Sequence, residues 1–218
     1  YGHSAGNESY RRKLADYYRG VGIDVTTDDM VITVGGSEAI FMAMTICLNP
    51  GDEVLVPEPF YANYNGFAME AGVNIKPISS TIANDFALPP MEEFERLITT
   101  RTKAILICNP NNPTGRLVDP RVIDAAACRC EQAGALLIVD ECFLGFAPDA
   151  RERSVAARAA CSRHVAVLSA FTKLYGMAGL RLGYLISGNA QLIEGIRRAG
   201  QAWPVSSVAE AAGIAALE

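Results

Sequence analysis

The chain has 218 residues, of which half are hydrophobic and a fifth are charged, with a formal net charge of −5. This composition is typical of a folded globular protein and excludes a fibrous or intrinsically disordered chain. No cluster of Lys and Arg supports a nucleic-acid partner, and no apolar run is long enough to cross a bilayer. We therefore expect a cytoplasmic protein with a small-molecule ligand and no nucleic-acid or membrane partner.

Strand-like and helix-like segments alternate along the chain. Short apolar runs rich in β-branched residues predict strands at Met30–Val34, Glu53–Val56, Asn74–Ile78, Lys103–Cys108, Ala135–Val139, Val165–Ser169 and Gly183–Ser187. Helices are predicted near Ser9–Arg19, Ser37–Leu48, Ala62–Ala71, Met91–Thr99, Pro120–Ala133, Ala190–Ala199 and Ser206–Leu217. The alternation predicts an α/β fold, a three-layer α/β/α domain with a mostly parallel seven-stranded sheet.

The six cysteines are scattered, and the closest pair is separated by one residue rather than by the two residues typical of zinc and redox sites. We interpret them as reduced, buried thiols. No metal site is predicted.

Four segments that follow predicted strands carry chemically informative residues, and ligands of open α/β sheets bind beyond the carboxyl ends of the strands. The first is Gly35-Gly36-Ser37-Glu38, which joins a strand to a helix, so that free backbone N–H groups would face a phosphate. The alternative is a tight turn with Ser37 as the helix N-cap. The segment matches neither the dinucleotide-binding G-x-G-x-x-G pattern nor the P-loop.

The second segment is N-P-N-N-P-T-G over Asn109–Gly115. Its two prolines and its glycine predict a rigid loop that aims an amide side chain. Asn112 would then donate a hydrogen bond to an anionic oxygen. A purely structural turn before the helix at Pro120 is the alternative.

The third is Asp140, which follows the apolar run Ala135–Val139. A carboxylate buried there requires a cation or hydrogen-bond donors, and a protonated pyridine nitrogen would serve. A capping or salt-bridged aspartate is the alternative.

The fourth is Ser169–Tyr184, an apolar, glycine-punctuated segment that contains one lysine, Lys173, and one arginine, Arg181. A lysine in apolar surroundings is a nucleophile suited to forming a Schiff base with an aldehyde, although most lysines lie on the surface. Arg181 would offer a planar fork of donors to a phosphate.

Together, the Gly-Gly-Ser turn, N-P-N-N-P-T-G, Asp140-Glu141 and K-x(7)-R within A-G-L-R-L-G-Y, in this order, resemble the class I/II aminotransferases, pyridoxal-phosphate (PLP) enzymes of fold type I. The resemblance extends over essentially all 218 residues. The first half is similar to aspartate-type aminotransferases. The second half is similar to histidinol-phosphate aminotransferases and threonine-phosphate decarboxylases.

The resemblance implies a role for each matching position. Lys173 would form the Schiff base with PLP, Asp140 would pair with the pyridine nitrogen, and Asn112 would bind the phenolic oxygen. Tyr61 would stack on the ring. The phosphate would be bound by Gly36, Ser37, Glu38, Thr172 and Arg181, and by Tyr1 of the neighbouring subunit, which implies a homodimer with shared active sites.

This sequence departs from the family pattern at two positions. Phe143 stands where the family commonly has a tyrosine that also binds the phenolic oxygen. Ala170 stands where Ser or Thr often helps to bind the phosphate. We interpret residues 1–218 as a PLP-binding large domain that lacks an N-terminal arm and a C-terminal small domain.

The activity that the resemblance implies is transfer of an amino group from an amino acid to a 2-oxo acid. The first alternative is decarboxylation of a phosphorylated amino acid on the same scaffold. The second is a PLP-binding regulatory module, which no basic segment of the chain supports.

Overall fold

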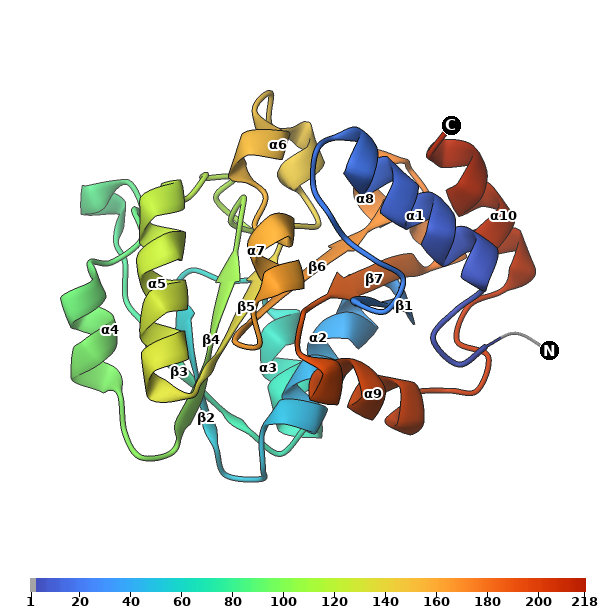
Figure 1. The fold of residues 1–218 in the computed structure, drawn as a ribbon. Helices are drawn as coiled ribbons and strands as arrows, with labels where there is room; N and C mark the ends of the chain where they lie inside the picture. Colours follow the sequence, from blue (N-terminus) through green and yellow to red (C-terminus); the bar gives the residue numbers. More distant parts are fainter. Residues whose placement is uncertain (1–2) are drawn as a thin grey trace.

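The computed structural model describes residues 3–218, in which a central sheet lies between two layers of helices (Figure 1). The strands are β1 (Met30–Val34), β2 (Glu53–Pro57), β3 (Asn74–Ile78), β4 (Thr102–Cys108), β5 (Leu136–Asp140), β6 (Val165–Ala170) and β7 (Leu182–Ile186). They lie in the order β1-β7-β6-β5-β4-β2-β3, and β7 is antiparallel to both of its neighbours while the other pairs are parallel. The predicted seven-stranded, mostly parallel sheet is confirmed.

The helices are α1 (Glu8–Gly20), α2 (Gly35–Cys47), α3 (Asn63–Glu70), α4 (Met91–Leu97), α5 (Pro120–Ala133), α6 (Ala150–Arg153), α7 (Ala156–Cys161), α8 (Phe171–Leu174), α9 (Ala190–Ala199) and α10 (Ser207–Ala216). Three short 3-10 turns lie at Ile82–Asn84, Leu144–Phe146 and Ala178–Leu180. Every predicted helix is present. The prediction missed α6, α7 and α8, because segments this short carry too little periodicity to be recognised. None of the helices within residues 3–218 is long and apolar enough to span a lipid bilayer.

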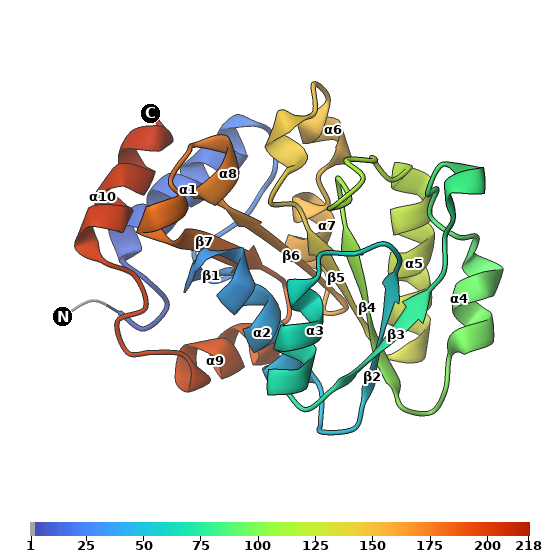
Figure 2. The ribbon, with the colours of Figure 1, turned by 180° about the vertical axis from the view of Figure 1, so that it is seen from behind.

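Each face of the sheet packs against its own layer of helices and forms its own hydrophobic core. In Figure 1, α1, α5, α7 and α10 lie on the near side of the sheet, and Figure 2 shows α2 and α3 on the opposite side. Along β4, Ile105 and Ile107 belong to the first core, whereas Ala104, Leu106 and Cys108 belong to the second. Because both faces are buried, the central strands are apolar over most of their length. The predicted three-layer architecture is therefore confirmed.

The segments singled out in the sequence lie along one edge of this sheet. Cys108, the last residue of β4, is paired with Asp140, the last residue of β5. β1 leads at the same edge into α2, and β6 leads into α8. Since β7 runs in the opposite direction, the turn that precedes it lies at this edge too.

The six cysteines are free, as predicted, but the prediction that all are buried is wrong. Cys108 and Cys130 are buried, whereas Cys128 and Cys161 are exposed. The two exposed thiols lie on the outer sides of α5 and α7. Burial was predicted because the neighbouring residues are apolar, but most of these neighbours are alanines, which also occur on exposed helix faces.

Candidate active site

A cavity of about 130 Å³ opens at the carboxyl edge of the sheet. Eight of the residues predicted from the sequence line it, namely Gly36, Ser37, Tyr61, Asn112, Asp140, Thr172, Lys173 and Arg181. They come from α2, the segment before α3, the loop after β4, the end of β5, α8 and the turn before β7. Residues up to 145 positions apart in the chain therefore form a single cavity.

One end of the cavity combines the start of α2 with the guanidinium group of Arg181. Helix α2 begins at Gly35, whose φ of +75° is readily adopted only by glycine. A Cβ atom at Gly35 would lie 2.7 Å from Arg181 Nη2, so the absence of a side chain lets the guanidinium lie against the first turn. Ser37 and Thr172 add hydroxyl groups to the same cavity. Free helix N–H groups, a fixed positive charge and two hydroxyls suit a phosphate group.

The side chain of Glu38 binds the start of α2 instead of lining the cavity. Its carboxylate accepts a hydrogen bond of 2.7 Å from the N–H of Val34, the residue before α2. The side chain does not line the cavity. Only the backbone N–H of Glu38 is therefore suited to bind a phosphate. The alternative of Ser37 as the helix N-cap is wrong, because Ser37 lies inside the first turn of α2.

Asp140 also lines the cavity, and the residue is almost completely buried, at 6% exposure. Its Oδ2 accepts a hydrogen bond of 2.7 Å from the hydroxyl of Tyr64, and its Oδ1 accepts one of 3.0 Å from the N–H of Cys142. Within residues 3–218 it forms no ion pair. A buried carboxylate that has only neutral donors fits a cationic ring nitrogen in the cavity.

Lys173 is presented by the short helix α8. The helix is anchored by Phe171, which is buried in the core and stacks on Tyr175 with ring centroids 4.7 Å apart. Lys173 Nζ lies 5.4 Å from the centroid of the Phe143 ring. Lys173 and Arg181 were expected to have apolar surroundings. Apart from the Phe143 ring beside Lys173, this expectation is wrong, because both side chains are exposed. In the described part of the chain neither forms an ion pair, so both positive charges remain available to a ligand.

The remaining predicted residues complete the cavity wall. Tyr61 is half-buried, and its ring is perpendicular to that of Tyr64 at a centroid distance of 5.5 Å. The loop before Asn112 is fixed by Asn111, whose amide donates to the carbonyl of Pro59 and accepts from the N–H of Thr114. The loop predicted over Asn109–Gly115 is present, and its Asn112 lines the cavity.

Tyr64, Cys108, Cys142, Ile40 and Ala178 also contribute to the site and were not predicted from the sequence. Cys108 had a recognisable signal, because it ends β4 beside Asp140. Tyr64 lies three residues after Tyr61, about one helical turn further on. Tyr1 lies outside the described residues.

The two departures from the family pattern have different surroundings. Phe143 lines the cavity, so a tyrosine there would place a hydroxyl at or near the same wall. Ala170 instead lines a neighbouring cavity of about 350 Å³ on the other side of α8.

Glu141 lines this second cavity as well, and its carboxylate is bound by Ser154 Oγ and by the N–H of Val155, each at 2.7 Å. Burial raises the pKa of Glu141 to about 7.

Known proteins match most or all of this chain. The family model for aminotransferase class I and II matches residues 1–218. The aspartate/prephenate aminotransferase of Thermus thermophilus is 31% identical over 185 residues, which are 84% of this chain and 47% of that relative. The histidinol-phosphate aminotransferase of Moorella thermoacetica is 30% identical over 198 residues, 90% of this chain and 50% of that relative.

A solved structure agrees with these sequence matches. The alanine aminotransferase from Pyrococcus furiosus has a TM-score of 0.88 and 30% sequence identity, and the match covers 100% of this chain and 56% of that structure. The chain thus spans about half the length of the relatives it matches. The family match, the sheet order and the lined cavity agree: the chain belongs to the class I and II aminotransferase family.

Proposed function

We propose that this chain is the cofactor-binding part of a PLP-dependent aminotransferase, which moves an amino group from an amino acid to a 2-oxo acid. Members of the family are PLP-dependent. The observation that carries the proposal is the single cavity in which Lys173, Asp140 and Arg181 meet. PLP, when bound, supplies an aldehyde that reacts with amines and a ring that accepts electrons.

The donor set of the cavity fits PLP at both ends. In the proposed arrangement, Arg181, Ser37, Thr172 and the first N–H groups of α2, including those of Gly36 and Glu38, bind the phosphate. Asp140 holds a proton on the ring nitrogen, since a buried carboxylate favours the cationic form of a group beside it.

The residues between these ends orient the ring and serve the reaction. Tyr61 would cover one face of the ring, and Asn112 would donate to its phenolic oxygen. The exposed Lys173 Nζ would hold the aldehyde carbon of PLP and, once displaced by the substrate amine, would move the proton from the substrate Cα to the cofactor. These roles are supported by the position of each residue on the cavity wall.

We further propose that the protein is a cytoplasmic homodimer that acts in amino-acid metabolism, with Tyr1 completing the phosphate site of the partner subunit. Mixing of two inactive variants tests the shared site. If Tyr1 serves the partner, co-expression of Lys173→Ala with Tyr1→Ala yields hybrid dimers with one intact site, and activity returns. If each subunit is self-sufficient, every site in the hybrid carries one defect and no activity returns.

The activity is tested by incubating the PLP-loaded protein with a mixture of amino acids and a 2-oxo acid acceptor. Formation of new 2-oxo acids, abolished in Lys173→Ala, is the expected result. Release of CO₂ without any new 2-oxo acid would overturn the proposed aminotransferase activity and would indicate decarboxylation.

A further inference from the structure

The hydroxyl of Tyr64, which does not itself line the proposed PLP cavity, donates a hydrogen bond to the carboxylate of Asp140. Tyr64 is fully buried, and its Oη donates to Asp140 Oδ2 over 2.7 Å although the two residues are 76 positions apart. The other carboxylate oxygen is held by the N–H of Cys142. Both donors are neutral, so neither neutralises the negative charge that Asp140 presents to the cavity.

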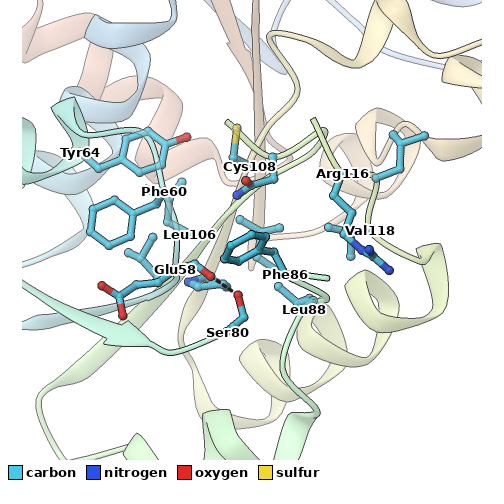
Figure 3. A pocket seen from close by; sticks show the side chains of 15 residues that line it. Glu58, Phe60, Tyr64, Ser80, Phe86, Leu88, Leu106, Cys108, Arg116 and Val118 are labelled. Atoms are coloured by element: carbon cyan, nitrogen blue, oxygen red, sulfur yellow. Dashed lines mark hydrogen bonds between the residues drawn. The ribbon is translucent and has the colours of Figure 1, made fainter. Parts of the chain in front are cut away.

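The first turn of α3 sets the position of this hydroxyl. The N–H of Tyr64 donates to the carbonyl of Tyr61 over 2.9 Å, and the ring of Phe60 is stacked on the Tyr64 ring at 6.2 Å. Figure 3 shows Phe60 and Tyr64 side by side, with Cys108 beyond the hydroxyl end of Tyr64. These three residues line a third cavity, of about 30 Å³, which has room for about one water molecule. Full burial and stacking on Phe60 therefore hold the Tyr64 ring beside Asp140.

The groups around Asp140 also keep their protons. Burial, and to a smaller extent the negative charge of Asp140, raises the pKa of the Tyr64 hydroxyl well above its ordinary value of 10. Burial raises the pKa of the Cys108 thiol to about 12. At neutral pH, Tyr64 is therefore a permanent neutral donor and Cys108 adds no charge.

We propose that Tyr64 is a positioning residue, which holds Asp140 so that its charge faces the nitrogen of the PLP ring and keeps that nitrogen protonated. The inference rests on the proposed function. A cationic donor at this place would neutralise part of the negative charge of Asp140. A neutral hydroxyl instead orients the carboxylate and leaves its charge available to the ring nitrogen. Tyr61, which precedes α3, would then act on the face of the ring, and Tyr64, in the first turn of α3, would act through Asp140.

The test compares Tyr64→Phe with Tyr10→Phe in the protein loaded with ¹⁵N-labelled PLP. Tyr10 is a matched control, because it is also fully buried and its hydroxyl has no hydrogen-bond partner among residues 3–218. In Tyr64→Phe we expect the dissociation constant of PLP to rise roughly tenfold, which is typical of losing a hydrogen bond to a charged group. We also expect the ring ¹⁵N chemical shift to move toward that of unprotonated pyridine. In Tyr10→Phe neither quantity should change.

A double-variant cycle separates this role from simple packing. The effect of Tyr64→Phe on PLP affinity should vanish in an Asp140→Ala background, where no carboxylate remains to be positioned. An unchanged affinity and ¹⁵N shift in Tyr64→Phe, or an equal loss of affinity in both backgrounds, would overturn the inference. If Tyr64→Phe fails to fold, 3-fluorotyrosine at position 64 keeps the shape and alters the donor, and an unchanged ¹⁵N shift there would overturn it too. Failure of the wild-type protein to take up PLP would instead overturn the proposed function.

Discussion

Gly183 packs directly against Gly35: a Cβ atom added to Gly183 would lie 2.5 Å from the carbonyl carbon of Gly35. The first residues of β7 therefore press against the turn that starts α2. Arg181, two residues before Gly183, reaches the same turn from a left-handed backbone conformation with φ of +57°. The proposed phosphate site thus depends on two backbone segments that approach more closely than side chains would permit.

Gly183→Ala should push these two segments apart. We expect it to weaken PLP binding and to reduce the free energy of unfolding by about 1–3 kcal/mol, which is typical of overpacking. Gly66→Ala is the matched control, since a Cβ at Gly66 in α3 meets no atom within 4 Å. The control should leave PLP affinity unchanged and stabilise the protein by up to about 1 kcal/mol. PLP titration and chemical denaturation of both variants measure the two effects. Equal PLP affinity and equal free energy of unfolding in the two variants would refute the claim that the phosphate site depends on this close approach.

Phe143→Tyr should improve the site. Phe143 lines the cavity, and the family commonly has a tyrosine there whose hydroxyl binds the phenolic oxygen of PLP. One added hydrogen bond is worth about 1 kcal/mol, so we expect PLP to bind up to about fivefold more tightly. Equilibrium titration of PLP by absorbance checks this. Weaker binding would show that position 143 has no access to the phenolic oxygen.

Asp140→Ala should bind PLP more weakly and, once loaded, lose the reaction. Without the carboxylate the ring nitrogen no longer stays protonated, and we expect turnover to fall by at least about 10²–10³-fold, the loss typical of removing a preorganised electrostatic group. Asp140→Glu should keep more activity because the charge remains. The measurements are single-turnover rates and PLP absorbance. Turnover near the wild-type rate in Asp140→Ala would assign Asp140 a structural role only.

Glu141→Gln should change the pH dependence of stability. Burial raises the pKa of Glu141 from 4.5 to about 7 in the folded protein, so between these pH values the folded state holds a proton that the unfolded state has lost. Stability is then lost as the pH rises from about 4.5 to 7, by on the order of 3 kcal/mol in all. Gln mimics the protonated carboxyl group.

The melting temperature of Glu141→Gln should therefore decline less than that of the wild type over this pH range. Glu95→Gln serves as a control, because Glu95 is an exposed partner of Arg129 on the surface. Parallel declines in the wild type and Glu141→Gln would contradict the raised pKa of Glu141.

The sheet and the main wall of the cavity could be predicted because their signals are local. Runs such as Leu136–Val139 are apolar, since both faces of the central strands are buried, and Asp140 follows this run at the edge of the sheet where the site lies. The loops after parallel strands meet at that edge, so Asn112, Asp140 and Lys173 could be expected to lie close together.

What could not be predicted depends on packing between distant segments. The hydrogen bond between Tyr64 and Asp140 exists because Tyr64 of α3 is buried in the same core as Cys108 of β4 and Ile138 of β5, which no local pattern reveals. The exposure of Lys173 was missed for a related reason. Its apolar neighbour Phe171 points into the core, whereas Leu174 is itself 43% exposed, so apolar letters around a lysine do not show that the lysine is buried.

The most direct test of the proposed function is to reduce the PLP-loaded protein with borohydride and map the labelled lysine. The chain has four lysines, which makes the assignment unambiguous. Lys13 and Lys76 lie near the carboxylates of Glu218 and Glu53, and Lys103 donates to the carbonyl of Thr100, all outside the cavity. We predict that the label is on Lys173 and that Lys173→Ala carries none. A label on any of the other three lysines, or persistent labelling of Lys173→Ala, would contradict the assignment of Lys173 as the PLP-binding residue.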